Sequence, residues 1–242
     1  MFTFNGKQSD DPALGIHRVL RVFLPLLPGT ADRTQDIPGM DGAYDLGFDR
    51  QPREIKVQFV LKQDSPADLF GYVREVAAWL NVREAKPFIY SYEPDRYYLA
   101  RPQGIVGLER LMNRIGIVEA TFLAFDPYAY ALDAKTADAF PALNEGTVPC
   151  PAIITATLTG PANFLRIDLA GTNDYLLIDR ELAQGDVVTI DTARRLTLIN
   201  GVDARVFVTA ASTYFDLPPG NFEFSTNPAS VDLMVEYRER WI

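Results

Sequence analysis

The chain carries, over residues 37–80, a loop IPGMDGAY (37–44), an alternating segment REIKVQFVLK (53–62) and a segment SPADLFGYVREVAAWL (65–80). In the middle segment every second residue is apolar, which is typical of a strand with one buried face. The last segment opens with a serine and a proline suited to cap and start a helix, and apolar residues then recur at helical spacing. These pieces predict a loop, a half-buried strand and one helix, at about 65–82, that packs on a sheet.

Composition indicates a folded protein and argues against a nucleic-acid-binding function. At 242 residues the chain is long enough for two domains, and 48% of it is apolar. The formal net charge of -9 argues against a nucleic-acid binder, because such proteins neutralise phosphates with Lys and Arg. An acidic surface still suits a protein past which DNA must move without sticking.

Strand and turn patterns predict a mainly β protein of two domains. Residues 1–130 indicate a β-sandwich or barrel-like domain that contains the one helix, and the Ala- and Pro-rich stretch 131–151 has the composition of a linker. Residues 152–242 show short strands, one of them at 203–208, separated by turn signals at regular intervals, which favours an antiparallel β-sandwich. Asn200-Gly201 is the clearest hairpin signal in the chain.

No motif for catalysis or cofactor binding is present in the sequence. His17 is the only histidine and lies in a predicted strand, and Cys150 is the only cysteine and lies between two prolines. Nucleophile elbows, phosphate loops and zinc or calcium spacings are all missing. There is no signal peptide and no apolar run near the ~18 residues of a membrane span. We therefore expect a cytoplasmic product with no catalytic residues, no cofactor, no metal site and no membrane contact.

Motifs in both halves of the chain occur in an order found in one protein family. In the first half they are FTFNG (2–6), the loop at 37–42, the strand from Arg53, the helix closing on Trp79-Leu80 and the turn EPDRYY (93–98); in the second half they are DVVTID (186–191), Asn200-Gly201, LPPG (217–220) and YRERW (237–241). Together they resemble the distal tail protein (Dit) family of long-tailed, non-contractile phages. The resemblance covers almost the whole chain.

The resemblance implies a structural role in a virion and no enzymatic activity. It implies an N-terminal domain that assembles into a hexameric ring and a galectin-like β-sandwich at the periphery of that ring. Such a ring connects the tail tube to the adsorption apparatus and surrounds the channel through which DNA leaves. The implied partners are further copies of the chain, the tail tube protein, the tape measure protein and tail-associated or receptor-binding proteins. The implied location is the phage tail tip, assembled in the bacterial host cytoplasm.

Residues 23–52 are the candidate arm between subunits. They form a long segment between two predicted strands, punctuated by Pro and Gly, and a segment of that length inside a compact domain usually has a function. Closed rings need contacts between different patches of neighbouring subunits, often supplied by an arm. The candidate interface residues are Pro38, Gly39, Met40, Asp41, Gly42 and Tyr44. The glycines permit tight turns, and Asp41 can accept hydrogen bonds from turn amides.

Two other functions stay open from the sequence. One is a carbohydrate-binding module for host attachment, built on the C-terminal sandwich and aromatic residues such as Tyr214, Phe215 and Trp241. Galectin-like sugar sites use a histidine and a stacking tryptophan, whereas this half has no histidine and a single tryptophan near its end. The other is a glycoside hydrolase, which needs two suitably separated carboxylates among the 32 acidic residues. No particular pair is indicated.

Overall fold

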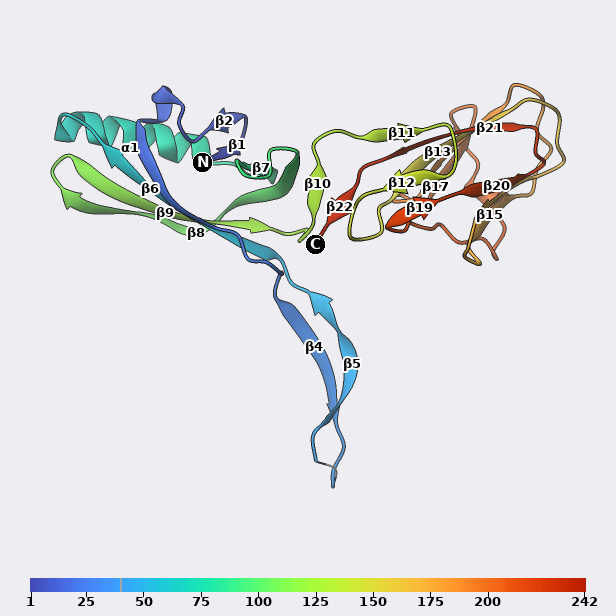
Figure 1. Ribbon diagram of the computed structural model, residues 1–242, viewed down its shortest axis with the longest axis horizontal. Helices are drawn as coiled ribbons and strands as arrows, with labels where there is room; N and C mark the ends of the chain where they lie inside the picture. The colour runs from blue at the N-terminus through green and yellow to red at the C-terminus, as the bar shows by residue number, and fades with distance from the viewer. Residues whose placement is uncertain (40) are drawn as a thin grey trace. The chain divides into compact units, whose positions relative to one another are not determined.

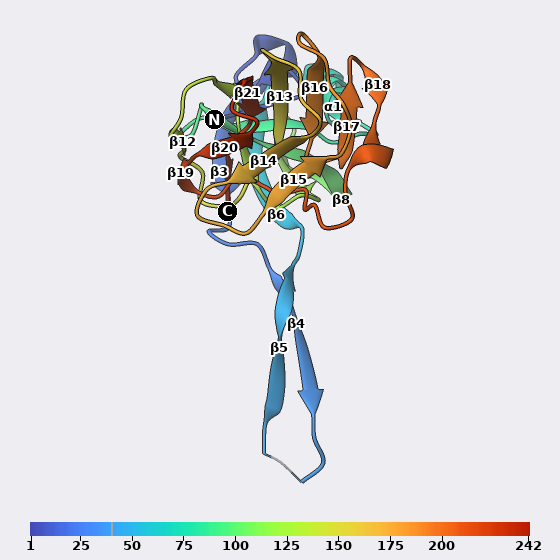
Figure 2. The same ribbon diagram turned by 90° about the vertical axis from the view of Figure 1, so that its right-hand side faces the viewer.

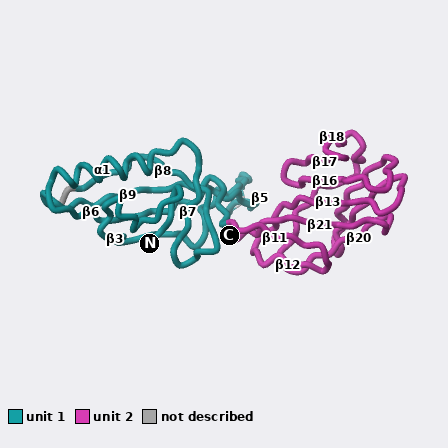
Figure 3. The backbone as a smooth tube through the Cα atoms, turned by 90° about the horizontal axis from the view of Figure 1, so that it is seen from above, with its two compact units in different colours: residues 1–129, 242 teal, residues 130–241 magenta. Residues whose placement is uncertain are grey.

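The computed structural model describes residues 1–39 and 41–242, and the chain divides into two compact units. Unit 1 comprises residues 1–129 with Ile242, and unit 2 comprises residues 130–241 (Figure 3). The expectation of a mainly β protein is confirmed. In the described part of the chain one α-helix, α1 (Pro66–Leu80), and two short 3₁₀ helices, η1 (Pro12–Leu14) and η2 (Arg205–Phe207), accompany the strands.

The first ten strands belong to unit 1, except that the last of them crosses the unit boundary (Figure 1). Their bounds are β1 (Phe2–Phe4), β2 (Lys7–Gln8), β3 (Ile16–Phe23), β4 (Thr30–Asp36), β5 (Ala43–Arg50), β6 (Arg53–Lys62), β7 (Lys86–Tyr90), β8 (Arg96–Met112), β9 (Ile115–Ala124) and β10 (Ala129–Ala131). The main sheet of unit 1 runs in the order β2-β1-β7-β8-β9-β6-β3. Strands β4 and β5 form a separate two-stranded sheet.

The alternating segment and the helix take the form that the sequence predicts. Strand β6 pairs with β9 along its whole length, and its burial alternates strictly between buried and more exposed residues up to Lys62. The Ser65 side chain accepts a hydrogen bond from the Asp68 amide at 3.1 Å and so caps α1. Leu69, Val76, Trp79 and Leu80 form the buried stripe of the helix. Helix and strand are thus the rigid frame of unit 1.

An aromatic cluster fixes α1 and the N-terminal strand on the sheet. The rings of Phe2 and Phe88 lie 5.2 Å apart between centroids, and those of Phe4 and Phe122 lie 4.8 Å apart. Trp79 is only 4% exposed, and its indole Nε1 donates a hydrogen bond of 2.8 Å to the Phe4 carbonyl. Buried tryptophans generally need such a partner for the indole N–H. Trp79 therefore anchors the helix to the N-terminal strand.

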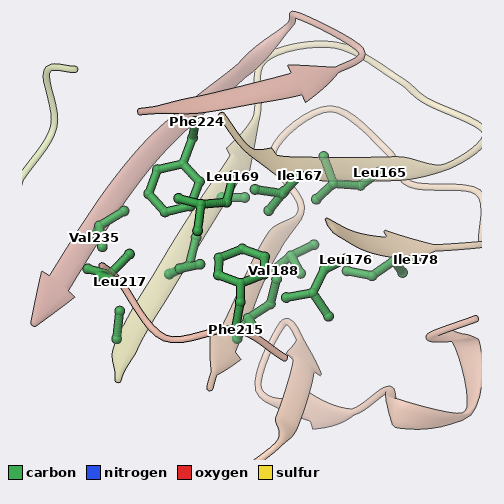
Figure 4. Close-up of a cluster of buried hydrophobic side chains, with 14 of the residues drawn as sticks. Leu165, Ile167, Leu169, Leu176, Ile178, Val188, Phe215, Leu217, Phe224 and Val235 are labelled. Carbon is green, nitrogen blue, oxygen red and sulfur yellow. The ribbon is translucent and has the colours of Figure 1, made fainter. Parts of the chain in front are cut away.

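Unit 2 is a β-sandwich. Its strands are β11 (Lys135–Ala137), β12 (Ala142–Asn144), β13 (Ala152–Leu158), β14 (Leu165–Leu169), β15 (Tyr175–Ile178), β16 (Val187–Asp191), β17 (Leu196–Ile199), β18 (Val202–Asp203), β19 (Gly220–Phe222), β20 (Phe224–Asn227), β21 (Val231–Tyr237) and β22 (Arg240–Trp241). One sheet has the order β11-β21-β13-β16-β17-β18 and the other β15-β14-β20. Ile167 and Leu176 of the smaller sheet pack in one buried cluster with Val188 and Val235 of the larger (Figure 4).

Two expectations about unit 2 are wrong. Residues 131–151 are not a bare linker, because they contain β11, which pairs with β21, and β12, which pairs with β19. Strands this short join a sheet through backbone bonds and leave little apolar pattern in the sequence. The strand expected at 203–208 ends at Asp203, where the carboxylate accepts a hydrogen bond from the Arg205 amide at 3.1 Å and η2 begins.

The hairpin predicted at Asn200-Gly201 is confirmed. It connects β17 to β18, and both turn residues have positive φ, +52° for Asn200 and +79° for Gly201. The Asn200 side chain also accepts a hydrogen bond from the Val187 amide at 2.9 Å and donates one to the Asp186 carboxylate at 2.9 Å. The turn is therefore tied to the neighbouring strand β16.

Candidate assembly surface

The segment expected as a loop-like arm is a β-hairpin. Strands β4 and β5 pair from Thr30↔Arg50 at the root to Asp36↔Ala43 near the tip. Figures 1 and 2 show them extending together as a ribbon beyond the main sheet of unit 1. Every residue of both strands is exposed. The sequence expectation missed the hairpin because β4 has no large apolar residue, so only β5 shows an alternating pattern.

Five of the six candidate interface residues lie at or beside the tip of this hairpin. Pro38, Gly39, Asp41 and Gly42 belong to the turn between the strands, and all are exposed. Gly39 and Gly42 have φ values of +86° and +85°, which other residue types adopt only with strain. Tyr44 lies in β5 rather than in the loop and is 50% exposed. The sixth residue, Met40, lies outside the described residues.

Three large apolar side chains of strand β5 are half exposed or more. Tyr44, Leu46 and Phe48 are 50%, 59% and 55% exposed. Sequence reasoning singled out Tyr44 and missed Leu46 and Phe48, although their spacing of two residues was a readable strand signal. Clustered exposed apolar side chains on a projecting element mark an interaction surface.

A bulge turns these side chains to both faces of the ribbon. Phe48 pairs with Asp32, and Tyr44 pairs with Gln35. Paired residues share a face, and positions 32 and 35 point to opposite faces because side chains alternate along a regular strand. The register shift occurs at Leu46-Gly47, where Gly47 has a φ of +89°. The ribbon therefore presents Tyr44 on one face and Phe48 on the other.

The ribbon is acidic and carries one ion pair across its strands. Residues 30–50 contain five aspartates and two arginines, a net charge of -3. Arg33 Nε donates a hydrogen bond of 2.9 Å to Asp49, and this bond holds the pKa of Asp49 below its usual range. Both side chains are more than half exposed, so solvent and salt screen the pair. The pair therefore adds little to the stability of the fold.

A buried arginine fixes the root of the hairpin. Arg53 is 2% exposed, its Nε donates a hydrogen bond of 3.0 Å to the Pro127 carbonyl, and its Nη1 bonds the Pro25 carbonyl. Its guanidinium lies 5.3 Å from the ring centroid of Tyr98. Burial lowers the pKa of Arg53, which stays charged at neutral pH. The arginine joins the chain before β4 to the end of the sheet and so limits the direction of the ribbon.

Sites for other chemistry receive no support from the described residues. Within residues 1–39 and 41–242, no group of three or more His, Cys, Asp or Glu is placed to hold a metal ion, and no helix could cross a membrane. Phe215 is 4% exposed within the core of unit 2, so its ring cannot stack on a sugar. The Tyr214 hydroxyl lies 2.8 Å from the Thr197 hydroxyl. Cys150 is fully buried, and burial raises its pKa to about 12.

Two family models match the chain, one for each half. The model of the phage tail protein RIFT-related domain matches residues 10–124, and that of the siphovirus-type tail component, C-terminal domain, matches residues 145–241. Together they include most of both units. A search of curated proteins found no match.

One solved structure shows the same fold over the whole chain. It is the crystal structure of the Dit (gp 19.1) protein of phage SPP1, which is described as a paradigm of the hub adsorption apparatus in phages infecting Gram-positive bacteria. The match covers 100% of this chain and 98% of the SPP1 chain, with a TM-score of 0.82 and 17% sequence identity. A chain of the phage P2 baseplate in its activated conformation with Ca matches 90% of each chain with a TM-score of 0.41 and 8% identity. The first similarity covers both units over their full length.

Proposed function

Because the chain belongs to the family of siphophage distal tail proteins, and is therefore a structural protein of a phage tail, we propose that it forms a hexameric ring through unit 1. The ring joins the tail tube to the adsorption apparatus, and DNA leaves through its channel. Its partners are the tail tube protein, the tape measure protein and tail-associated or receptor-binding proteins. The ring assembles in the bacterial host cytoplasm and performs no catalysis.

The observation that carries this proposal is the exposed hairpin. A closed ring needs a heterologous contact, in which one patch of a subunit meets a different patch of its neighbour. Strands β4 and β5 supply such a patch, since the large apolar side chains of β5 lie on both faces and are half exposed or more. We assign the interface role to the six residues predicted from the sequence, Pro38, Gly39, Met40, Asp41, Gly42 and Tyr44, and add Leu46 and Phe48 along β5.

Unit 2 has a different role in this proposal. As a galectin-like β-sandwich it decorates the ring and offers a surface to other tail proteins. The alternative of a carbohydrate-binding module ranks lower, because Phe215, one of the three aromatic residues that motivated it, is buried in the sandwich core. No pair of carboxylates is singled out for the glycoside hydrolase alternative either.

Removing the hairpin tests the proposal. In the variant, Asn-Gly replaces residues 31–49 and closes a two-residue turn between Thr30 and Arg50, which already pair at the root. The Gln51 amide keeps its hydrogen bond of 2.7 Å to the Gly29 carbonyl. Light scattering after size exclusion should give the mass of six chains for the native protein and of one chain for the variant, and the variant should still unfold cooperatively on heating. A variant that still forms the ring would contradict the proposal.

A further inference from the structure

The chain contains two Asn-Gly dipeptides, Asn5-Gly6 and Asn200-Gly201, and they lie in matching turns. The first connects β1 to β2 and the second connects β17 to β18, each as a two-residue hairpin turn. The φ values are +47° and +74° in the first turn, against +52° and +79° in the second. All four residues are exposed. The two turns therefore present closely similar backbones to solvent.

The side chains of the two asparagines are held very differently. Asn200 Oδ1 accepts a hydrogen bond of 2.9 Å from the Val187 amide, and Asn200 Nδ2 donates one of 2.9 Å to the Asp186 carboxylate. Asn5 Nδ2 makes a single bond of 3.5 Å to the Trp79 carbonyl, a distance at the outer limit for a hydrogen bond. Among the residues that the structure describes, none bonds Asn5 Oδ1. The amide of Asn200 is thus tied at both ends, whereas one weak bond holds that of Asn5.

An Asn-Gly pair reacts in water without an enzyme. The glycine nitrogen loses its proton and forms a bond to the side-chain carbonyl carbon of asparagine, whose amide nitrogen takes up a proton and leaves as ammonia. Water then opens the resulting succinimide ring at one of its two carbonyls and yields aspartate or isoaspartate. Glycine favours the reaction because no side chain hinders its nitrogen. The asparagine side chain must first turn toward that nitrogen, and it gives up the hydrogen bonds that it makes elsewhere.

We propose that Asn5 is a site of spontaneous deamidation in the folded chain, and that its hydrogen bonds protect Asn200 from the same reaction. Because the backbones of the two turns match, the side-chain bonds decide which pair reacts. Turning Asn200 breaks two hydrogen bonds, one of them to a charged acceptor, whereas turning Asn5 breaks one weak bond. Asn5 should therefore react at least about 10-fold faster, a ratio that corresponds to about 1.4 kcal/mol.

The product alters the anchor of the N-terminal strand. Phe4, next to Asn5, accepts the indole hydrogen bond of Trp79. An aspartate at position 5 has a carboxylate oxygen in place of the amide nitrogen that faces the Trp79 carbonyl, so a weak attraction becomes a repulsion. Trp79 lies in the last turn of α1, where the helix dipole also disfavours negative charge. Deamidation should therefore loosen β1 from the helix.

Peptide mapping of the aged full chain tests the assignment. Trypsin releases Asn5 in the peptide 1–7 and Asn200 in the peptide 196–205, so one sample reports both reactions. In mildly alkaline buffer the first peptide should show the mass gain of an amide converted to an acid, and the second should show it at least about 10-fold more slowly. A chain unfolded in guanidinium chloride should modify both at comparable rates. Equal rates in the folded chain, or the same preference after unfolding, would overturn the assignment.

A variant of the protecting residue tests the cause. Asp186→Ala removes the acceptor of the Asn200 Nδ2 bond, so deamidation of Asn200 should accelerate several-fold. Asn5 in the same sample should keep its native rate and is the internal control. An unchanged rate at Asn200 would refute the protective role of this bond.

A second pair of variants tests the consequence for stability. Asn5→Asp reproduces the charge of the product, and Asn5→Gly removes the amide without adding a charge and accepts the same positive φ. Thermal unfolding should have a lower midpoint for Asn5→Asp than for Asn5→Gly. Equal midpoints, or the reverse order, would refute the repulsion at the Trp79 carbonyl.

Discussion

Replacing Phe48 by serine should weaken assembly without unfolding the chain. Phe48 is 55% exposed. With about 200 Å² for a whole aromatic side chain, this fraction corresponds to roughly 110 Å² that a neighbour can cover. At about 25 cal/mol per Å² complete cover contributes about 2.7 kcal/mol, and partial cover about 2 kcal/mol. A loss of about 2 kcal/mol at each contact corresponds to about 30-fold weaker association.

Sedimentation over a concentration series measures this effect directly. Phe48→Ser should need a concentration about 30-fold higher than the native chain for half-assembly, while its free energy of unfolding changes by less than about 0.5 kcal/mol. Tyr92→Ser is the matched control, because it removes an aromatic side chain that is 81% exposed but lies far from the hairpin in the sequence, after β7. The reasoning is refuted if Phe48→Ser assembles like the native chain, or if Tyr92→Ser disrupts assembly equally.

Three further predictions concern stability and reactivity. Trp79→Phe should lower the free energy of unfolding in urea by about 2–3 kcal/mol, because the Phe4 carbonyl loses its partner and a gap remains; a loss under about 1 kcal/mol would contradict the anchoring role. Asn200→Ala should cost about 1–2 kcal/mol, since alanine at a φ of +52° is strained and two hydrogen bonds vanish; Asn200→Gly, which loses the same bonds without the strain, should cost less, and equal losses would count against the turn argument. Burial raises the pKa of Cys150 from 9.0 to about 12, so the folded chain keeps a proton that the unfolded chain loses, and stability should fall as the pH rises above about 9. Maleimide at pH 8 should label Cys150 only after unfolding, and rapid labelling of the native chain would exclude this burial.

The frame of unit 1 could be predicted because its burial pattern is strong. Strand β6 matches its predicted bounds because every second residue of it is buried. Helix α1 matches its predicted bounds to within two residues because a capping serine precedes it and apolar residues recur along one face. The turn at Asn200-Gly201 was predictable for a local reason, its positive φ values.

The assembly surface could be predicted only in part. Proline and glycine at 37–42 indicated a turn, but β4 has no large apolar residue, so only β5 shows an alternating pattern. The role of Arg53 depends on contacts that only the fold creates.

The central claim is that the hairpin of unit 1 closes a ring of chains. Negative-stain electron microscopy of the purified native chain, beside the variant with Asn-Gly in place of residues 31–49, tests it most directly. The account predicts closed six-membered rings with a central opening for the native chain and single particles for the variant. Native chains without rings, or rings that persist without the hairpin, would contradict it.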